Sequence, residues 1–260
     1  MTDSRLTDHA SQLLAAYRTK QAAAPLSERD PDLTIDDAYE IQLAQVATWL
    51  ADGAVVKGYK VGLTSQAMQR QLGVDQPDFG HLTASMFHLE HNPIDTAAFL
   101  QPKVEPEIAF VLGRDLAGPG VTVPEAIRAV DFVLPALELI DSRIADWRIG
   151  IVDTVADNAS SAGLILGSKP TRIDTVDLAR VGCNLVQDGE VVATGAGAAV
   201  LGSPINALVW LTNTLGERGI AFRAGQVILP GSVTASYAVR SGSVVAAEFA
   251  GLGSVTAVFA

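Results

Sequence analysis

The stretch Lys103-Val104-Glu105-Pro106-Glu107-Ile108-Ala109-Phe110-Val111-Leu112 decides how the rest of the chain is interpreted. Apart from its two carboxylates, it has the apolar composition of a buried β-strand. Side chains alternate between faces along a strand, so Glu105 and Glu107 point the same way, roughly 7 Å apart. Two carboxylates buried together repel each other unless one stays protonated or a cation lies between them. The pattern therefore predicts a metal ion that prefers oxygen ligands.

The next strongly apolar strand candidate, Pro135-Ala136-Leu137-Glu138-Leu139-Ile140, contains a third carboxylate. Glu138 is the lone acid in it and is a candidate third ligand. The alternative is that Glu105 and Glu107 lie on the solvent face of an edge strand, which Pro106 would tolerate. Spacing alone leaves both interpretations open, because a Glu-x-Glu pair is a weak motif.

Length and composition exclude several classes of protein. The chain has 260 residues, of which 48% are hydrophobic and 18% charged, and this predicts a compact globular protein with a real core. Its formal net charge is −11 and it has no basic stripe, so nucleic acid is not an expected partner. A bound anion would have to be held by a local cation, because the protein as a whole repels anions.

Cysteine content and the first residues indicate the compartment. Cys183 is the single cysteine, so an intramolecular disulfide is impossible and a reducing cytoplasm fits. Residues 1–20 lack the basic start and apolar core of a signal peptide. No stretch approaches about 18 uninterrupted apolar residues. We expect a soluble cytoplasmic protein that does not bind membranes.

The N-terminal part is predicted to be helical. Residues 7–20 carry apolar side chains near helical spacing and form the first predicted helix. Thr34, with Asp37 at the capping-box position, begins a second helix that Gly53 ends. Neither helix shows a motif that carries chemistry.

Residues 54–62 are predicted to form a strand, followed by a short helix that Gly73 ends. Lys60 would lie just before the N-terminus of that helix, whose free N–H groups attract anions. Lys60 is thus part of a candidate carboxylate pocket. The alternative is an ordinary surface lysine, since lysines are mostly exposed.

The segment Gly73-Val74-Asp75-Gln76-Pro77-Asp78-Phe79-Gly80 is predicted to be a loop by its turn residues. Asp78 is an acid–base candidate there, or simply a turn former. His81, His88 and His91 follow and suggest a zinc site, but without a cysteine partner their spacing is a poor match for one.

The second half of the chain is predicted to be mainly β-structure. Residues 153–161 form a polar run that suits either ligand hydrogen bonds or a satisfied buried turn. A hairpin turn is expected at residues 187–190 and a helix from Pro204 to about residue 215. Short apolar strands separated by glycine fill residues 227–260, which is typical of a sandwich, roll or barrel.

Five motifs, taken in chain order, resemble the 2-hydroxypenta-2,4-dienoate (2-keto-4-pentenoate) hydratases of the fumarylacetoacetate hydrolase superfamily. Each motif is weak alone, but five in the same order over nearly the whole chain are specific. They are Lys60-Val61-Gly62-Leu63-Thr64-Ser65, Gln76-Pro77-Asp78-Phe79-Gly80, Lys103-Val104-Glu105-Pro106-Glu107-Ile108-Ala109-Phe110-Val111, Pro135-Ala136-Leu137-Glu138 with Asp141-Ser142-Arg143, and Ala156-Asp157-Asn158-Ala159-Ser160-Ser161.

The resemblance implies an α+β fold, with a mixed β-roll or sandwich core of the fumarylacetoacetate hydrolase type and an N-terminal helical region. We accordingly expect residues 1–75 to form a helical region that contributes one strand and Lys60. Residues 76–260 are expected to form the β-rich, metal-binding catalytic core, and the two parts to act as one functional unit.

The resemblance also implies roles for particular residues. The ion would be Mg²⁺ or Mn²⁺, and its ligands would be Glu105, Glu107 and Glu138. The positions that match those proposed in the family for acid–base work are Lys60 and Asp78. Weaker matches to substrate-binding positions are Thr64, Ser65 and Ser160.

The reaction implied by the resemblance is addition of water to 2-hydroxypenta-2,4-dienoate, or to a longer 2-hydroxyalka-2,4-dienoate, giving a 4-hydroxy-2-oxo acid. Such hydro-lyases act in the catabolism of aromatic rings or sterols. The expected partners are this small anionic substrate and further copies of the chain in a homo-oligomer, with a complex with a neighbouring pathway enzyme as a further possibility.

Two other functions stay open. A 4-oxalocrotonate-type decarboxylase would form the same metal-stabilised enolate by losing CO₂ from a 2-oxo-3-enedioate. Asp78 favours the hydratase, because the decarboxylases as usually described lack an acid in this loop. A non-catalytic binding relative is the third interpretation, and retention of Lys60 with all three glutamates argues against it.

Overall fold

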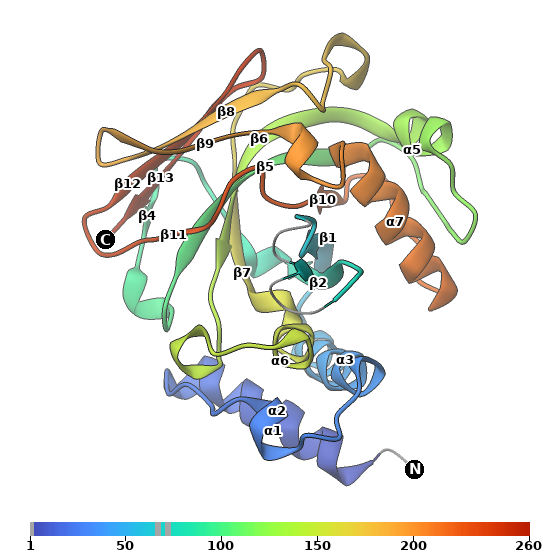
Figure 1. Cartoon of the computed structure of the whole chain (residues 1–260), viewed down its shortest axis with the longest axis vertical. Helices are drawn as coiled ribbons and strands as arrows, with labels where there is room; N and C mark the ends of the chain where they lie inside the picture. Colours follow the sequence, from blue (N-terminus) through green and yellow to red (C-terminus); the bar gives the residue numbers. More distant parts are fainter. Residues whose placement is uncertain (1–2, 66–68, 71–73) are drawn as a thin grey trace.

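The computed structural model describes residues 3–65, 69, 70 and 74–260, in which two β-sheets are accompanied by helices (Figure 1). The helices are α1 (Ser4–Thr19), α2 (Leu26–Arg29), α3 (Ile35–Ala51), α5 (Val123–Ala129), α6 (Ile151–Ala156) and α7 (Pro204–Glu217). The strands are β1 (Val56–Gly62), β2 (Asp78–Thr83), β3 (Phe87–His88), β4 (Pro93–Ile94), β5 (Lys103–Leu112), β6 (Val130–Ile140), β7 (Ser161–Leu166), β8 (Gly182–Gln187), β9 (Glu190–Ala196), β10 (Val227–Leu229), β11 (Tyr237–Ala238), β12 (Val244–Phe249) and β13 (Gly253–Phe259).

The larger sheet contains eight described strands, in the order β2-β1-β10-β5-β6-β7-β3, with β11 paired to the beginning of β5. Strands β5 and β6 pair along almost their whole length, from Lys103 opposite Ile140 to Leu112 opposite Val130. The sheet is mixed, because β1 runs parallel to β10 and β3 parallel to β7 while the other pairs are antiparallel. The predicted strand at residues 103–112 thus lies inside the sheet.

The interior position of β5 contradicts the edge-strand alternative and raises the question of how Pro106 is tolerated. On the side away from β6, β10 pairs only near Phe110 and β11 only near Val104, so no regular ladder covers the middle of β5. Pro106 accepts a hydrogen bond there from Val233 N, at 3.0 Å. The N and C=O of one strand residue point to the same side, so the missing N–H of Pro106 removes no bond to β6.

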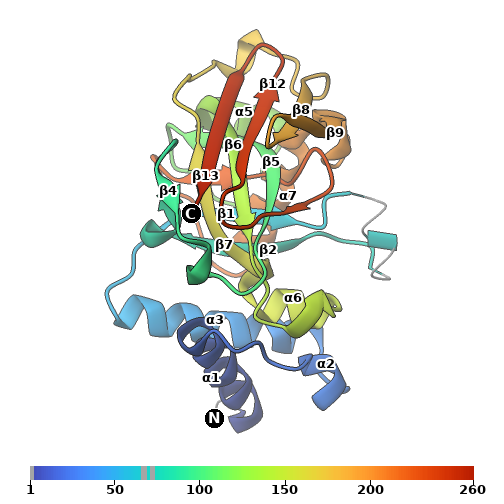
Figure 2. The ribbon, with the colours of Figure 1, turned by 90° about the vertical axis from the view of Figure 1, so that its left-hand side faces the viewer.

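The smaller sheet contains the strands β4-β13-β12-β8-β9. Strands β12 and β13 contact β6, so this sheet packs on the larger one, and Figure 2 shows β12 and β13 side by side in front of it. The hairpin between β8 and β9 turns at Asp188 and Gly189, both with positive φ, as a tight two-residue turn requires. This confirms the turn predicted at residues 187–190.

The N-terminal helices lie together at one end of the molecule, below both sheets in Figures 1 and 2. Helix α3 begins with the predicted capping box: Asp37 N donates to Thr34 Oγ1, and Thr34 N donates to Asp37 Oδ2. Gln42 of α3 donates to the backbone oxygens of Phe79 and Val155, which ties the helix to β2 and α6. None of the described helices is long and apolar enough to span a membrane.

One local prediction is corrected. Asp78-Phe79-Gly80 is not loop but the start of β2, because residues 78–83 are all buried and pair with β1. The short strands predicted for residues 227–260 are present: β10 and β11 join the larger sheet, and β12 and β13 the smaller. The helix expected to end at Gly73 lies partly outside the described residues.

Strand β1 shares one sheet with strands of the β-rich part. The division of the chain at residue 75 remains a prediction.

Candidate active site

Three glutamates converge on one face of the β5–β6 pair. Glu105 lies directly opposite Glu138 in the ladder, and Glu107 is two residues further along β5. One oxygen from each carboxylate lies within 4.8 Å of the others. Glu107 and Glu138 are fully buried, and Glu105 is half-buried. Strand alternation therefore placed Glu105 and Glu107 correctly on one face, and the cross-strand register adds Glu138.

The hydrogen bonds of this cluster are incomplete. Gly231 N donates to Glu107 Oε2 at 2.8 Å. Among the described residues, no donor hydrogen-bonds to Glu107 Oε1 or to either oxygen of Glu138. Burying a carboxylate oxygen without a hydrogen-bond donor costs folding free energy. The glutamate cluster therefore destabilises the fold unless another group completes its hydrogen bonds.

The electrostatics of the cluster point to a missing positive charge. Burial, followed by the charge of Glu138, raises the pKa of Glu105 to about 7. The same two causes raise the pKa of Glu107 well above its ordinary value. Burial also raises the pKa of Glu138, although Lys60 opposes this. Three oxygen donors at this spacing fit a hard divalent cation such as Mg²⁺ or Mn²⁺.

Lys60 and Asp78 approach the glutamates from the antiparallel pair β1–β2. Lys60 Nζ lies 3.5 Å from Glu138 Oε1, and both side chains are buried. Burial alone would lower the pKa of Lys60, but the surrounding carboxylates, Glu138 foremost, raise it above its ordinary value. Lys60 is thus a buried ammonium inside an acidic cluster, and its interpretation as a surface lysine is wrong.

Asp78 is held next to Lys60 by the register of β1 and β2, which pairs it with Gly62. A Cβ atom at position 62 would lie 2.1 Å from Asp78 Oδ1 and 3.3 Å from Lys60 Nζ, so only glycine leaves room for both charged groups. Thr154 Oγ1 donates a long hydrogen bond, 3.5 Å, to Asp78 Oδ2. Burial raises the pKa of Asp78, and Lys60 opposes the increase.

A cavity of about 260 Å³ lies beside this site. Its lining residues include Lys60, Asp78, Glu105 and Ser160. This volume suits a small ligand of a few carbon atoms rather than a large cofactor.

Ser160 reaches the cavity through a strained turn. Asn158, Ala159 and Ser160, which form the short helix η4, all have φ between 52° and 56°, a left-handed region that non-glycine residues rarely occupy. Asn158 holds the turn by accepting from His81 N at 2.8 Å and donating to His81 O at 2.9 Å. Ser160 Oγ is buried and makes no hydrogen bond with the described residues, so it is available to a ligand.

Thr64 and Ser65 lie close by but are not among the described residues that line the cavity. Thr64 is buried against Gly231, where a Cβ atom would meet its Oγ1 at 2.1 Å. Gly231 N donates a hydrogen bond to Glu107. By packing on Gly231, Thr64 therefore supports the backbone next to this candidate metal ligand. Ser65 is half-buried and accepts a backbone hydrogen bond from Gln69 N.

Two further lining residues were not predicted from the sequence. Lys103 and Trp147 both face the cavity, and Lys103 Nζ lies 4.1 Å from the centre of the Trp147 ring. The signal for Lys103 was present in the strand alternation, because it lies two residues before Glu105 and so shares its face. Nothing in the sequence around Trp147 indicated its position.

The three histidines do not form the zinc site that was considered. His81 is buried and its Nδ1 lies 3.1 Å from Gln42 Oε1, whereas His91 is exposed. The three glutamates are the only group with metal-ligand spacing among the described residues.

Comparison with known proteins places the chain in a family. The sequence profile described as fumarylacetoacetate (FAA) hydrolase C-terminal matches residues 47–260. The chain therefore belongs to the fumarylacetoacetate hydrolase family, and the predicted fold type is confirmed. A 2-keto-4-pentenoate hydratase of Paraburkholderia xenovorans (strain LB400) is 47% identical over 259 residues, covering 100% of this chain and 96% of that protein. A 2-hydroxyhexa-2,4-dienoate hydratase of Comamonas testosteroni is 43% identical over 236 residues, covering 90% and 89%.

A solved structure is also similar over its full length. The 4-oxalocrotonate decarboxylase from Pseudomonas putida G7, complexed with magnesium and adipate, superposes with a TM-score of 0.96 at 35% sequence identity. The match covers 100% of this chain and 99% of that chain. This likeness supports a divalent metal as the family's cofactor.

Proposed function

We propose that this protein is a metal-dependent hydro-lyase that adds water to 2-hydroxypenta-2,4-dienoate or a longer 2-hydroxyalka-2,4-dienoate, giving a 4-hydroxy-2-oxo acid. The observation that carries the proposal is a cluster of three glutamates, two of them with unpaired buried oxygens, beside a small cavity lined by Lys60, Asp78 and Glu105. Relatives that are 42–47% identical over nearly the whole chain and named as hydratases support it.

The residues that would hold the ion are Glu105, Glu107 and Glu138, which supply the oxygen donors that Mg²⁺ and Mn²⁺ prefer. When bound, such an ion stabilises the negative charge that develops on the substrate's 2-oxygen. Three carboxylates leave a divalent site with a net charge near −1, so an anionic substrate needs a further cation. Lys60 supplies it from within the cavity, and Lys103 lies at the cavity wall.

Lys60 and Asp78 are the groups positioned to move protons. Conversion of the dienol to the conjugated 2-oxo-3-enoate removes the proton of the 2-hydroxyl and delivers one to C5. Water then adds across the double bond, with its oxygen at C4 and a proton at C3. Burial raises the pKa of Asp78, which favours its uptake of a proton, and the adjacent Lys60 ammonium stabilises its charged form. Ser160 Oγ is free to orient the substrate.

A decarboxylase is the second candidate, and the 0.96 TM-score of the Pseudomonas putida G7 decarboxylase is the observation that favours it. Loss of CO₂ from a 2-oxo-3-enedioate generates the same enolate, so the same glutamates and Lys60 would serve. The choice depends on Asp78, whose carboxylate lies in the cavity where the hydratase needs a proton carrier.

The experiment that separates the two offers the purified protein, supplied with Mg²⁺ or Mn²⁺, each substrate in turn. Loss of the ultraviolet absorbance of 2-hydroxypenta-2,4-dienoate with formation of 4-hydroxy-2-oxopentanoate is the expected result. Release of CO₂ from 2-oxohex-3-enedioate with an inert dienoate would make the protein a decarboxylase. Inactivity on both substrates would favour a non-catalytic binding role.

We further propose that the enzyme is a cytoplasmic homo-oligomer that acts in the catabolism of aromatic or sterol rings. Cys183 is buried and unpaired, which suits a reducing compartment. Sedimentation velocity on the purified protein tests the oligomeric state, and a monomer at micromolar concentration would contradict it.

A further inference from the structure

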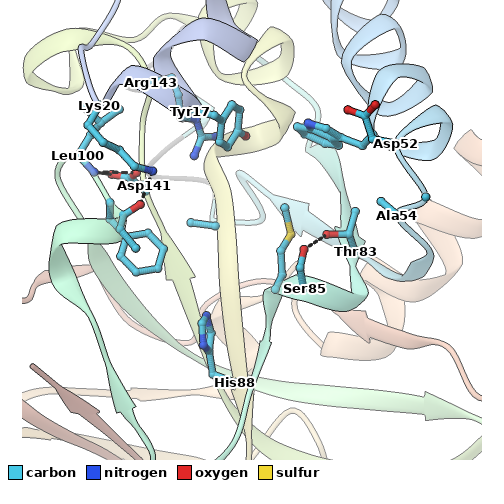
Figure 3. Close-up of a pocket in the computed structure, with 16 residues that line it drawn as sticks. Tyr17, Lys20, Asp52, Ala54, Thr83, Ser85, His88, Leu100, Asp141 and Arg143 are labelled. Carbon is cyan, nitrogen blue, oxygen red and sulfur yellow. Dashed lines mark hydrogen bonds between the residues drawn. The ribbon is translucent and has the colours of Figure 1, made fainter.

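A second cavity, larger than the candidate active site, lies beside the end of strand β6. Its volume is about 580 Å³, and none of its lining residues lines the catalytic cavity. The walls come from the end of α1, the end of α3, the segment that leads into β3, and the residues that follow β6, as Figure 3 shows. Segments far apart in the chain therefore enclose a space of ligand size.

Tyr17 is fixed in this cavity with its hydroxyl unused. Its ring packs edge-on against Trp49, with centroids 5.6 Å apart, and the Arg143 guanidinium lies 4.3 Å from the ring centre. The hydroxyl oxygen is buried, yet it makes no hydrogen bond with the described residues. Burial raises the pKa of Tyr17, so the hydroxyl remains a neutral donor. A buried, immobilised donor without an acceptor is costly unless a ligand supplies one.

Among the other polar groups of the wall, Lys20 has donors that are free for a ligand. Asp141 accepts from the backbone N–H groups of Leu100 and Gln101, so its oxygens are already used. Lys20 Nζ donates to Ala98 O, which leaves further N–H donors on the ammonium. Figure 3 shows Lys20, Tyr17 and Arg143 on one side of the cavity. Asp52 is exposed.

Part of the remaining wall is apolar. Met86, Phe99, Leu100 and Ala162 line the cavity together with His88. Burial lowers the pKa of His88, so its imidazole is neutral at physiological pH. A ligand that fits both halves needs an acceptor group at one end and an apolar body at the other.

We propose that this second cavity binds a small carboxylic acid with an aromatic or short aliphatic body. The carboxylate accepts from the Tyr17 hydroxyl and the Lys20 ammonium, and the body packs on Phe99 and Met86. The site is independent of the three glutamates and of the metal, so it exists whether or not the protein is a hydratase.

The test is calorimetric titration of metal-free protein with benzoate, compared with benzamide, its neutral analogue of the same shape. We expect one benzoate per chain and benzamide binding at least about tenfold weaker, because the amide loses the charge interaction with Lys20. Tyr17→Phe and Lys20→Gln should each weaken benzoate binding by about tenfold, the loss of one hydrogen bond to a charged group. Lys57→Gln removes an exposed lysine elsewhere on the surface and is the matched control.

Three outcomes would overturn the proposal. The first is no benzoate binding, or equal affinity in the wild type and in both cavity variants. The second is binding that Lys60→Gln abolishes and Tyr17→Phe does not, which would assign benzoate to the catalytic cavity. The third is a change of oligomeric state in Tyr17→Phe or Lys20→Gln, seen by sedimentation, which would mean that a second copy of the chain covers the cavity. Tyr17→Phe keeps the ring between Trp49 and Arg143, so its fold is expected to persist.

Discussion

Two clusters of buried charge lie close together in this protein, and they differ in how their charges are satisfied. Arg143 and Asp157 form a self-contained pair: Arg143 Nε lies 2.5 Å from Asp157 Oδ1, and Arg143 N donates to Asp157 Oδ2 at 2.8 Å. Arg143 Nη2 also donates to Asp157 O, and Nη1 to Ser161 O. The glutamate cluster has a single long ion pair with Lys60 and several oxygens without donors.

This difference in hydrogen bonding indicates a structural role for the Arg143–Asp157 pair and a ligand-binding role for the glutamate cluster. A buried ion pair that is held by several hydrogen bonds stabilises one conformation. Buried carboxylates without enough donors need a further partner, such as a bound ion or ordered water, or a catalytic role. The Arg143–Asp157 pair therefore anchors the turn that carries Ser160, while the glutamates are the ligands we propose for the cation.

The largest expected effect comes from removing one glutamate. Glu107→Gln should lower kcat/KM for the dienoate by at least about 1,000-fold, because it removes one ligand of the proposed ion. The stability of the metal-free protein should stay the same or rise, since one of several repelling buried charges is lost. Steady-state kinetics and urea unfolding measure the two effects. Glu248→Gln, at an exposed position on β12, is the control, and activity within tenfold of wild type for Glu107→Gln would contradict the assignment.

The second cluster should respond in the opposite way. Arg143→Met is expected to cost about 3–5 kcal/mol of unfolding free energy, because it leaves Asp157 buried without its partner. The double variant Arg143→Met/Asp157→Leu should recover much of that loss, since no unpaired charge remains. Urea denaturation of the three proteins gives the comparison, and additive losses in the double variant would show that the two residues do not act as a pair.

Metal should stabilise the protein through the glutamates alone. At about 100 times its Kd, Mg²⁺ or Mn²⁺ is expected to add roughly 3 kcal/mol to the unfolding free energy. The gain should shrink below pH 7, because the pKa of Glu105 is raised to about 7 and protons then compete with the ion. Thermal unfolding with and without metal at pH 8 and pH 6 measures this. An equal gain in Glu107→Gln would place the ion elsewhere.

A smaller effect is expected from His81, a buried neutral group on β2. Burial lowers the pKa of His81 to about 4, whereas the unfolded chain takes up a proton near pH 6.5. Stability contributed by the neutral ring is thus present above pH 6.5 and is lost as the pH falls, by about 2 kcal/mol at pH 5. Unfolding free energies at pH 7 and 5 should show a smaller decline in His81→Gln than in the wild type. The exposed His91→Gln should decline as the wild type does.

Much of the site followed from strand periodicity and the family resemblance. Alternation along β5 placed Glu105 and Glu107 on one face, and the apolar run around Glu138 correctly predicted the strand that lies opposite. The interior position of β5 could not be predicted, because it depends on its pairing with β10, which lies far along the chain: Val111 pairs with Val227.

The errors have physical causes. Proline and glycine around Asp78 predicted a loop, but pairing with β1 and burial at residues 78–83 outweighed local turn preference. The helix ending near Lys20 showed no chemical motif, because Tyr17 and Lys20 acquire a role only when the residues after β6 and the segment before β3 close a cavity around them. Side chains brought together by distant segments leave no local signal in one sequence.

The central claim is that Glu105, Glu107 and Glu138 together hold the divalent ion on which the reaction depends. The most direct measurement is calorimetric titration of chelator-treated protein with Mn²⁺, with dienoate turnover followed in parallel as the ion is added back. We predict one ion per chain, turnover that rises in proportion to occupancy, and loss of both in Glu107→Gln. Full turnover by the metal-free protein, or unchanged Mn²⁺ binding by Glu107→Gln, would contradict the account.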